Sequence, residues 1–308
     1  MCGIVGIFNN KEAFKLVSKA VKIMKNRGRD GSGVSVGKGE NIISNNAVGH
    51  CLHSVVSNVE QPIIGKGILV ANSEIYNWKE LCEKYRIDAR NDSEMILKIF
   101  DKYELDKIEE FDGDYACAYW NDNNVYLLRD ILGVKPLWYS LEDGLSFCSE
   151  KKILDKLGMK NIHELNPRII IKYNISENKA EFIKRKFFEL GSCSDDYDTA
   201  KEKIKRYLAN AVEKRTTEVK TGLLFSGGVD SSFIALILKN LGVKFKCYTA
   251  VFEDHGIKEA KDLGYAQNAA EEIGVELEIV RIKLKDVKKE IGKVVNLIES
   301  TNVTKVSV

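Results

Sequence analysis

The stretch Leu223-Leu224-Phe225-Ser226-Gly227-Gly228-Val229-Asp230-Ser231-Ser232 decides how the second half of the chain folds. An apolar run ends in two glycines, and a polar turn then opens the apolar segment 233–241. This order predicts a buried strand, a tight loop and the N-terminus of a helix. Glycine adopts positive φ without strain and lets a ligand approach the backbone. The hydroxyls of Ser226, Ser231 and Ser232 and the unpaired N–H groups of the helix would then form a nest for an anion such as phosphate.

Asp230 lies in the same loop and would repel a phosphate unless a cation lay between them. Mg²⁺, which prefers oxygen ligands, fits that role. The loop has no Gly-Lys-Ser/Thr, so it differs from the loops that serve γ-phosphoryl transfer. A helix cap with a glycine-rich approach is the structural alternative, but the Ser-Gly-Gly-x-Asp-Ser order is more specific than a lone glycine pattern.

These residues resemble the pyrophosphate loop of the ATP pyrophosphatases, which adenylate a substrate and release pyrophosphate. The resemblance implies a site for ATP at Ser226, Gly227, Gly228, Asp230, Ser231 and Ser232, with Mg²⁺ on Asp230. Alternating strand and helix patterns over 221–300, with one helix expected over 258–273, predict a parallel sheet wrapped by helices. In such sheets ligands lie at the carboxyl ends of the strands. Leu224 and Val251 lie at two such ends. By resemblance they flank the adenine and ribose of ATP; otherwise they are ordinary core residues.

Length and composition limit the possible classes of protein. A chain of 308 residues suggests two domains, and 44% hydrophobic with 30% charged residues is a globular composition. The net charge of +2 gives no reason to expect a nucleic acid or an acidic membrane surface as partner. We see no signal peptide and no apolar run that could span a bilayer. Seven scattered cysteines without a C-x-x-C pair indicate a reduced, cytoplasmic protein.

The chain begins Met1-Cys2-Gly3-Ile4-Val5-Gly6-Ile7. Removal of Met1 would leave Cys2 as the N-terminal residue, with an α-amine whose pKa is near 8. Such an amine can act as the base that activates its own thiol as a nucleophile. Taken alone, however, the pattern favours a buried cysteine at the start of a strand.

Further along, three segments contain polar residues that fit a site. Asn72 and the adjacent N–H of Ser73, at the expected end of a strand over 68–71, could form an oxyanion hole or only a turn. Two amphipathic helices are expected over 78–85 and 92–103. The run 91–94 is typical of a helix N-cap, although Asp92 could instead face a ligand's amine. In the segment 129–137, Arg129 and Asp130 are expected to pin a turn. His50 and His53 flank a cysteine, but no second cluster of metal ligands accompanies them.

Several motifs of the N-terminal half occur in one order that is more specific than any of them alone. They are Met-Cys-Gly-Ile-Val-Gly-Ile, Arg27-Gly28-x-Asp30-Gly31, Asn72-x-Glu74-Ile75-Tyr76-Asn77, Asp92-Ser93-Glu94, Asp112-Gly113 and Arg129-Asp130-x-Leu132-Gly133-x-Lys135-Pro136. This set resembles the class II glutamine amidotransferase domain of the asparagine synthetase B family. The resemblance implies an Ntn hydrolase, an αββα sandwich, over residues 1–190. After the polar break 189–196, it implies an α/β domain with a parallel sheet and a pyrophosphate loop over 197–308.

The resemblance also implies a role for each of the site residues. Cys2 would attack the amide of glutamine, with its α-amine as base, and Asn72 and the N–H of Ser73 would hold the oxyanion. Glu74 and Asp92 would contact the amino group of glutamine. The ammonia would then reach a carboxylate activated as its acyl-adenylate, with aspartate as the default acceptor.

Three positions depart from the family pattern. Leu52 stands where the family has an arginine that pairs with the carboxylate of glutamine, and Ser73 stands where the family has glycine. Arg29 stands where the family has proline, and it could replace the charge that is missing at Leu52. A positive φ at Ser73 would be strained.

Other functions therefore stay open. One is a non-enzymatic or regulatory relative with a degenerate glutaminase pocket, and another is a tRNA-modifying enzyme built on the same loop. By resemblance, the segment 303–308 enters a further parallel strand. Family synthetase domains continue beyond the point that matches Val308, with a second acidic Gly-Ala-Asp-Glu segment. We therefore expect a fragment, a short form or one subunit of a split synthetase, associated as a homodimer or with a partner chain, and unable to make the amide product alone.

Overall fold

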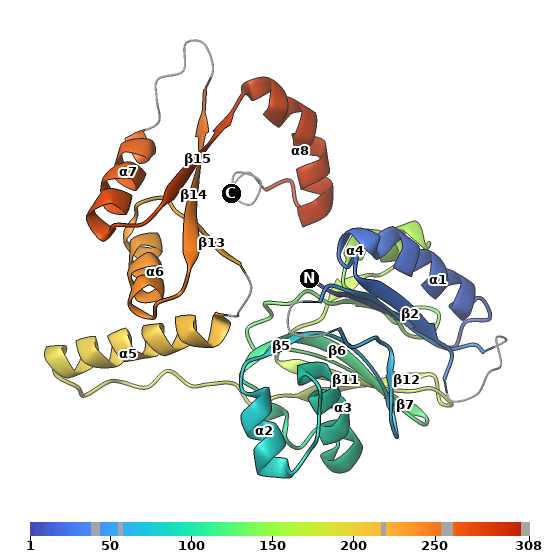
Figure 1. Cartoon of the computed structure of the whole chain (residues 1–308). Helices are drawn as coiled ribbons and strands as arrows, with labels where there is room; N and C mark the ends of the chain where they lie inside the picture. The colour runs from blue at the N-terminus through green and yellow to red at the C-terminus, as the bar shows by residue number, and fades with distance from the viewer. Residues whose placement is uncertain (38–43, 55–57, 217–219, 254–260, 303–308) are drawn as a thin grey trace. The chain divides into compact units, whose positions relative to one another are not determined.

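The computed structural model describes residues 1–37, 44–54, 58–216, 220–253 and 261–302. The strand expected over 303–308 and the first turn of a helix expected from Lys258 lie outside these residues. The chain divides into two compact units, Met1–Leu190 and Gly191–Val308 (Figure 1). Each unit is described by itself.

Unit 1 contains two six-stranded sheets in which the strand pairs are antiparallel. The first sheet has the order β10-β8-β9-β1-β3-β2, and the second has the order β12-β11-β7-β6-β5-β4. The strands of the first are β1 (Gly3–Ile7), β2 (Gly31–Ser35), β3 (Ala47–Leu52), β8 (Trp138–Ser140), β9 (Ser146–Cys148) and β10 (His163–Glu164). Those of the second are β4 (Ile63–Ile64), β5 (Ile68–Ile75), β6 (Gly113–Asn121), β7 (Asn124–Arg129), β11 (Ile169–Asn174) and β12 (Lys179–Lys184).

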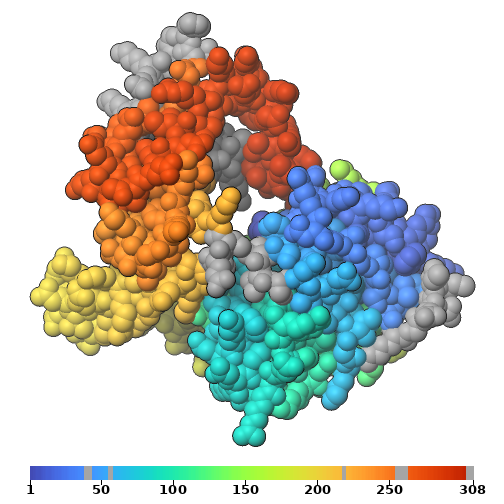
Figure 2. All heavy atoms as spheres, in the orientation of Figure 1, coloured from blue at the N-terminus to red at the C-terminus, as the bar shows by residue number. Residues whose placement is uncertain are grey.

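The two sheets pack face to face, and helices cover their outer faces (Figure 1). Helices α1 (Ala13–Ile23) and α4 (Lys151–Lys156) cover the first sheet, and α2 (Trp78–Tyr85) and α3 (Asp92–Tyr103) cover the second. In the space-filling view the side chains of α2 and α3, in cyan to teal, form the outer surface over that sheet (Figure 2). The αββα sandwich expected for residues 1–190 is therefore confirmed.

The alternation of side chains along β1 explains why its apolar run is continuous. Ile4 and Phe8 point into the core between the sheets, whereas Val5 and Ile7 pack under α1. A strand that is buried on both faces has no polar position, so an unbroken apolar run follows from its place in the sandwich. This packing holds the residues beside the N-terminus in the interior of a sheet.

The predicted boundaries of two helices in unit 1 are confirmed. The helix expected after Asn91 spans Asp92–Tyr103, and the Asn91 side chain accepts a hydrogen bond of 2.9 Å from the backbone N–H of Glu94. That bond satisfies one of the free N–H groups in the first turn. The helix over Trp78–Tyr85 is also as predicted.

Unit 2 contains a three-stranded parallel sheet of order β13-β14-β15, as the alternating pattern predicts. The strands are β13 (Thr221–Leu224), β14 (Phe245–Phe252) and β15 (Leu277–Ile282). The helices are α5 (Tyr197–Arg215), α6 (Val229–Asn240), α7 (Lys261–Ile273) and α8 (Leu284–Ile298). A small core joins the sheet to α6 and α7 through Phe225, Ala235, Cys247, Ala266 and Ala270. None of the helices described in either unit is long and apolar enough to cross a membrane.

Candidate active site

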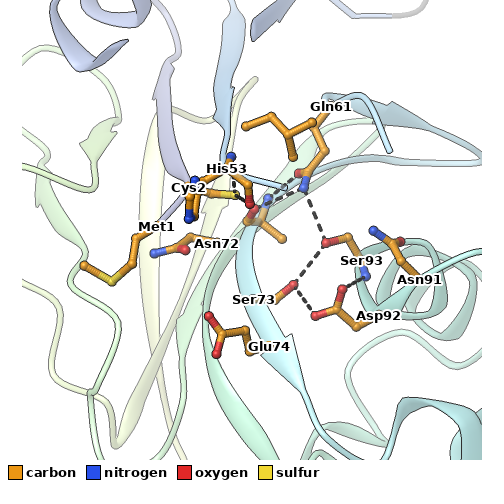
Figure 3. Close-up of a pocket in the computed structure, with 12 residues that line it drawn as sticks. Met1, Cys2, His53, Gln61, Asn72, Ser73, Glu74, Asn91, Asp92 and Ser93 are labelled. Atoms are coloured by element: carbon orange, nitrogen blue, oxygen red, sulfur yellow. Dashed lines mark hydrogen bonds between the residues drawn. The ribbon is translucent and has the colours of Figure 1, made fainter. Parts of the chain in front are cut away.

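One pocket of unit 1 gathers most of the residues that the sequence singled out (Figure 3). Those residues are Cys2, Asn72, Ser73, Glu74 and Asp92. They come from the start of β1, from β5 and from the first turn of α3, segments up to 90 positions apart in the sequence. The sandwich brings them together because β1 and β5 belong to facing sheets.

Hydrogen bonds hold Cys2 at the head of β1. Its carbonyl accepts a hydrogen bond of 2.9 Å from Arg27 Nε. Its sulfur accepts one of 3.3 Å from the backbone N–H of His53. Burial raises the pKa of the thiol, and the pKa of the Met1 amine is lowered first by burial and then by nearby Arg27 and Lys135.

The side chain of Asn72 is a hydrogen-bond donor without a partner. Asn72 is buried, and its Nδ2 has no acceptor among the residues that the structure describes. Leaving such a donor unsatisfied costs about 1–3 kcal/mol, so a buried example calls for a functional explanation. Asn72 and Cys2 line the same pocket (Figure 3).

The backbone N–H of Ser73 lies on an edge of β5 that no strand covers. The short β4 pairs only with Ile68 and Leu69, and farther along this edge the N–H of Ala71 donates to Gln61 Oε1 (2.7 Å). The N–H of Ile75 donates to Asp92 Oδ2 (3.1 Å). Because N–H groups alternate along a strand, that of Ser73 points to the same edge, between these two. Within the described parts of the chain it has no partner, so it can serve a ligand beside the Asn72 amide.

The expected strand end at Ala71 is wrong. Strand β5 continues to Ile75, because residues 72–75 pair with β6 over 113–116. On the other edge, side chains replace a partner strand. Ser73 lies within this extended strand and does not have positive φ, so the strain considered for it does not arise.

A network of side chains fixes this edge and includes residues that the sequence did not indicate. Gln61 Nε2 donates to the carbonyl of Ala71 (3.1 Å) and to Ser93 Oγ (3.3 Å). Ser73 Oγ donates to Asp92 Oδ2 (2.9 Å), and the N–H of Ser93 donates to Asp92 Oδ1 (2.8 Å). Burial raises the pKa of Asp92, and the bonds from Ile75, Ser73 and Ser93 oppose that shift. No local sequence signal marked Gln61, because its partners lie ten and more residues away.

Leu52, where the family's carboxylate-binding arginine is missing, and Arg29, its predicted replacement, lie in different surroundings. Leu52 is buried and lines the pocket. Arg29 is exposed and does not line it, so its role as a replacement charge stays a prediction. His53 lines the pocket beside Leu52, and its Nδ1 lies 3.5 Å from Asp30 Oδ2.

The turn after β7 is pinned as predicted. Arg129 Nε donates to the carbonyl of Lys135 (2.6 Å), and Asp130 Oδ1 accepts from the N–H of Val134 (2.8 Å). Asp130 Oδ2 accepts from the N–H of Lys135 (3.0 Å). Both pinning side chains are buried.

His50 should make the stability of unit 1 sensitive to acid. It is fully buried on β3, its Nε2 donates to the carbonyl of Ala71 (3.1 Å), and burial lowers its pKa to about 4. The unfolded chain takes up this proton near pH 6.5, so stability is lost as the pH falls from about 6.5 to about 4. This difference between the unfolded and folded pKa corresponds to roughly 3 kcal/mol of stability. Urea unfolding of the wild type and His50→Gln at pH 7, 5.5 and 4.5 measures the difference, and parallel pH curves would contradict this role.

In unit 2 the predicted phosphate loop joins β13 to α6. Gly227 has a φ of +73°, and a Cβ there would lie 2.4 Å from the carbonyl oxygen of Tyr265, so the loop requires glycine. Ser232 Oγ is buried and has no hydrogen-bond partner within the described ranges. An unpartnered hydroxyl at the N-terminus of a twelve-residue helix fits an anion such as pyrophosphate.

The remaining residues predicted for ATP lie around this loop. Ser226 Oγ and Ser231 Oγ are 3.2 Å apart, and Gly228 is the N-cap of α6. Asp230 is exposed in the first turn. Leu224 is the last residue of β13 and is 80% exposed, whereas Val251, near the end of β14, is 5% exposed. Across the described parts of both units, no group of three or more acidic, His or Cys residues could hold a metal ion.

The αββα sandwich of unit 1, with its N-terminal strand buried inside it, is the fold of the N-terminal-nucleophile hydrolases. A family-wide sequence profile described as "Glutamine amidotransferase domain" matches residues 1–208, and one described as "Asparagine synthase" matches residues 203–308. The chain belongs to the glutamine amidotransferase family.

Individual relatives agree with this assignment. A Methanocaldococcus jannaschii protein named as an asparagine synthetase (glutamine-hydrolysing) is 33% identical over 100% of this chain and 63% of its own length. Escherichia coli asparagine synthetase B (glutamine-hydrolysing) is 29% identical over 79% of this chain and 46% of its own length. The chain thus spans about half to just under two thirds of these relatives.

A solved structure supports the fold. Glutamine phosphoribosylpyrophosphate amidotransferase from Bacillus subtilis matches with a TM-score of 0.55 and 15% identity. The match covers 85% of this chain and 70% of that one.

Proposed function

We propose that this protein hydrolyses glutamine at Cys2 and delivers the ammonia to an acyl-adenylate, with aspartate as the default acceptor. The observation that carries the proposal is the pocket that Cys2 and Asn72 line together, in which the Asn72 Nδ2 donor has no partner among the described residues. A regulatory relative without catalysis would have no need for a buried amide donor without a partner. The names of the relatives, which are glutamine-hydrolysing asparagine synthetases, support the same function.

The glutaminase reaction follows from these groups. Once Met1 is removed, the Cys2 α-amine takes the thiol proton and the thiolate adds to the amide carbon of glutamine. Asn72 Nδ2 and the N–H of Ser73 donate to the oxyanion that forms. The α-ammonium then returns its proton to the leaving nitrogen, ammonia departs, and water hydrolyses the thioester to glutamate. Met1 itself lines the pocket, so its removal also opens space for the substrate.

Glu74 and Asp92 provide negative charge for the α-amino group of glutamine. The Glu74 side chain is 41% exposed, and Asp92 is buried at the start of α3. An ammonium that lies between two carboxylates makes charge-assisted hydrogen bonds, which are the stronger kind. Arg29 is still only predicted to supply the positive charge that pairs with the carboxylate of glutamine.

For the second half-reaction we propose that ATP binds at the loop of unit 2. Ser226, Gly227, Gly228, Ser231 and Ser232 would hold the pyrophosphate, with Leu224 and Val251 beside the adenosine. Asp230 would hold Mg²⁺, which would neutralise phosphate charge when bound. The required glycine at 227 and the unpartnered Ser232 hydroxyl support this assignment. We also propose a cytoplasmic location, with which seven free cysteines agree.

The direct test supplies the protein with amide-¹⁵N glutamine, Mg-ATP and aspartate. Glutamate is the expected product of this chain alone. AMP and labelled asparagine are expected only when a partner chain completes the synthase domain, and a panel of other small carboxylates would then identify a different acceptor. Absence of glutamate release, together with no labelling of Cys2 by 6-diazo-5-oxo-L-norleucine, would instead favour the regulatory alternative.

Asp230→Asn should weaken the binding of Mg-ATP roughly tenfold while leaving ATP binding in EDTA unchanged, because the carboxylate serves the ion. Isothermal titration calorimetry with and without Mg²⁺ measures both affinities. Asp198→Asn is the matched control, since Asp198 lies in the first turn of α5 away from the loop. Equal Mg-ATP affinities in the two variants would remove Asp230 from the site.

A further inference from the structure

Lys135 brings a buried positive charge to the edge of the glutaminase pocket. Its side chain is only 6% exposed, and its Nζ lies 3.1 Å from Oε1 of Glu74. Burying an ammonium is unfavourable unless it is paired, so this contact is the reason that Lys135 can be buried. Lys135 does not itself line the pocket, whereas Glu74 does.

The backbone of Lys135 is fixed at both of its polar groups. Its N–H donates to Asp130 Oδ2 (3.0 Å), and its carbonyl accepts from Arg129 Nε (2.6 Å). Arg129 also donates to the carbonyls of Gly133 (2.6 Å) and Leu165 (2.9 Å). The second bond connects the turn to the residue that follows β10. These bonds fix the backbone of the turn. The segment 129–137, which the sequence analysis interpreted as structural, therefore places the Lys135 side chain against Glu74.

The Lys135–Glu74 ion pair uses only one of the two carboxylate oxygens of Glu74 and leaves the other for a ligand. Oε1 is engaged by Lys135, whereas Oε2 has no hydrogen bond from the described residues. Asp92, in the same pocket, already accepts bonds from Ser73, Ile75 and Ser93. Without Lys135, two carboxylates would face each other across the pocket with no fixed cation beside Glu74, and the Glu74 side chain would be free to rotate away.

We propose that Lys135 is a positioning residue that holds Glu74 in the orientation that receives the α-ammonium of glutamine. This inference rests on the proposed glutaminase function. It assigns to the Arg129–Lys135 turn a part in substrate selection: amides with a free α-amino group are favoured over amides without one.

The test compares glutamine with glutaramate, the same amide without the α-amino group, in the full chain. Lys135→Met should raise KM for glutamine roughly tenfold with a smaller change in kcat, because the pair is partly exposed at Glu74. Its kcat/KM for glutaramate should change less than about threefold, since that substrate gains nothing from Glu74. Lys135→Arg should restore most of the affinity for glutamine.

The control variant is Lys84→Met, which removes another Lys–Glu pair of unit 1, that with Glu110, outside the pocket. In a Glu74→Gln background, Lys135→Met should have little further effect, since both act on one contact. Lys135→Gln provides a second uncharged variant if the methionine variant unfolds, and thermal melts identify that case.

The outcomes separate the two proposals. Wild-type protein that neither hydrolyses glutamine nor reacts with 6-diazo-5-oxo-L-norleucine would overturn the glutaminase function itself. An active wild type with an unchanged KM in Lys135→Met would overturn the role of Lys135. Equal losses with glutamine and glutaramate would also overturn it, because they would show a general structural effect.

Discussion

Replacing Cys2 with alanine should reduce glutamine hydrolysis to the background rate, a loss of roughly 10⁴-fold or more, because no other group can form the thioester. The variant should still fold, since Cys2 precedes β1 and contributes no side chain to the apolar cores. Glutamate release, followed with glutamate dehydrogenase, measures the loss. Labelling by 6-diazo-5-oxo-L-norleucine, followed by mass spectrometry, should disappear with it.

Cys82→Ala is the matched control, because Cys82 has intermediate exposure like Cys2 but lies on α2 away from the pocket. It should keep full activity. Active protein that retains Met1 would contradict the role of the Cys2 α-amine as base, even if the thiol proved essential.

Asn72→Ala should lower kcat for glutamine hydrolysis about 10²–10³-fold, the usual loss when one oxyanion donor is removed. The change in KM should be smaller, because the Nδ2 donor acts mainly when charge develops on the substrate oxygen. Asn72→Asp tests the same donor with a side chain of similar shape and an acceptor in its place. Steady-state kinetics at saturating and limiting glutamine separate the two constants.

The control here is Asn123→Ala, since the Asn123 amide is engaged elsewhere in unit 1 with Asn174 and Ser176. The Asn72→Ala variant should also be no less stable than the wild type, because the Nδ2 donor has no partner among the described residues to lose. An unchanged kcat in Asn72→Ala would assign the oxyanion to other donors.

Local patterns were sufficient to predict the parallel sheet, the helix over 92–103 and its Asn91 cap. Each depends on contacts within a few residues or on an apolar period, and such signals are visible in sequence. The αββα sandwich was predicted only from the family resemblance, because the sequence of a single strand does not show which sheet it will pack against.

The environment of the site could not be predicted in the same way. Gln61 acts on Ala71 and Ser93, and Lys135 acts on Glu74, across 10, 32 and 61 positions. The sequence shows only a glutamine before a proline and a lysine in a turn. The continuation of β5 to Ile75 also depends on distant partners, namely β6 on one edge and the side chains of Gln61 and Asp92 on the other.

The side chains that complete the edge of β5 also bear on how this protein behaves at high concentration. A bare strand edge is a template on which a second molecule can add a strand, which is a route to aggregation. Here an incoming strand would have to displace the Gln61 amide at Ala71 and the Asp92 carboxylate at Ile75. It would also bring its own carbonyls against a buried negative charge. The groups that leave one N–H open for a substrate therefore also protect the sheet from pairing with another copy.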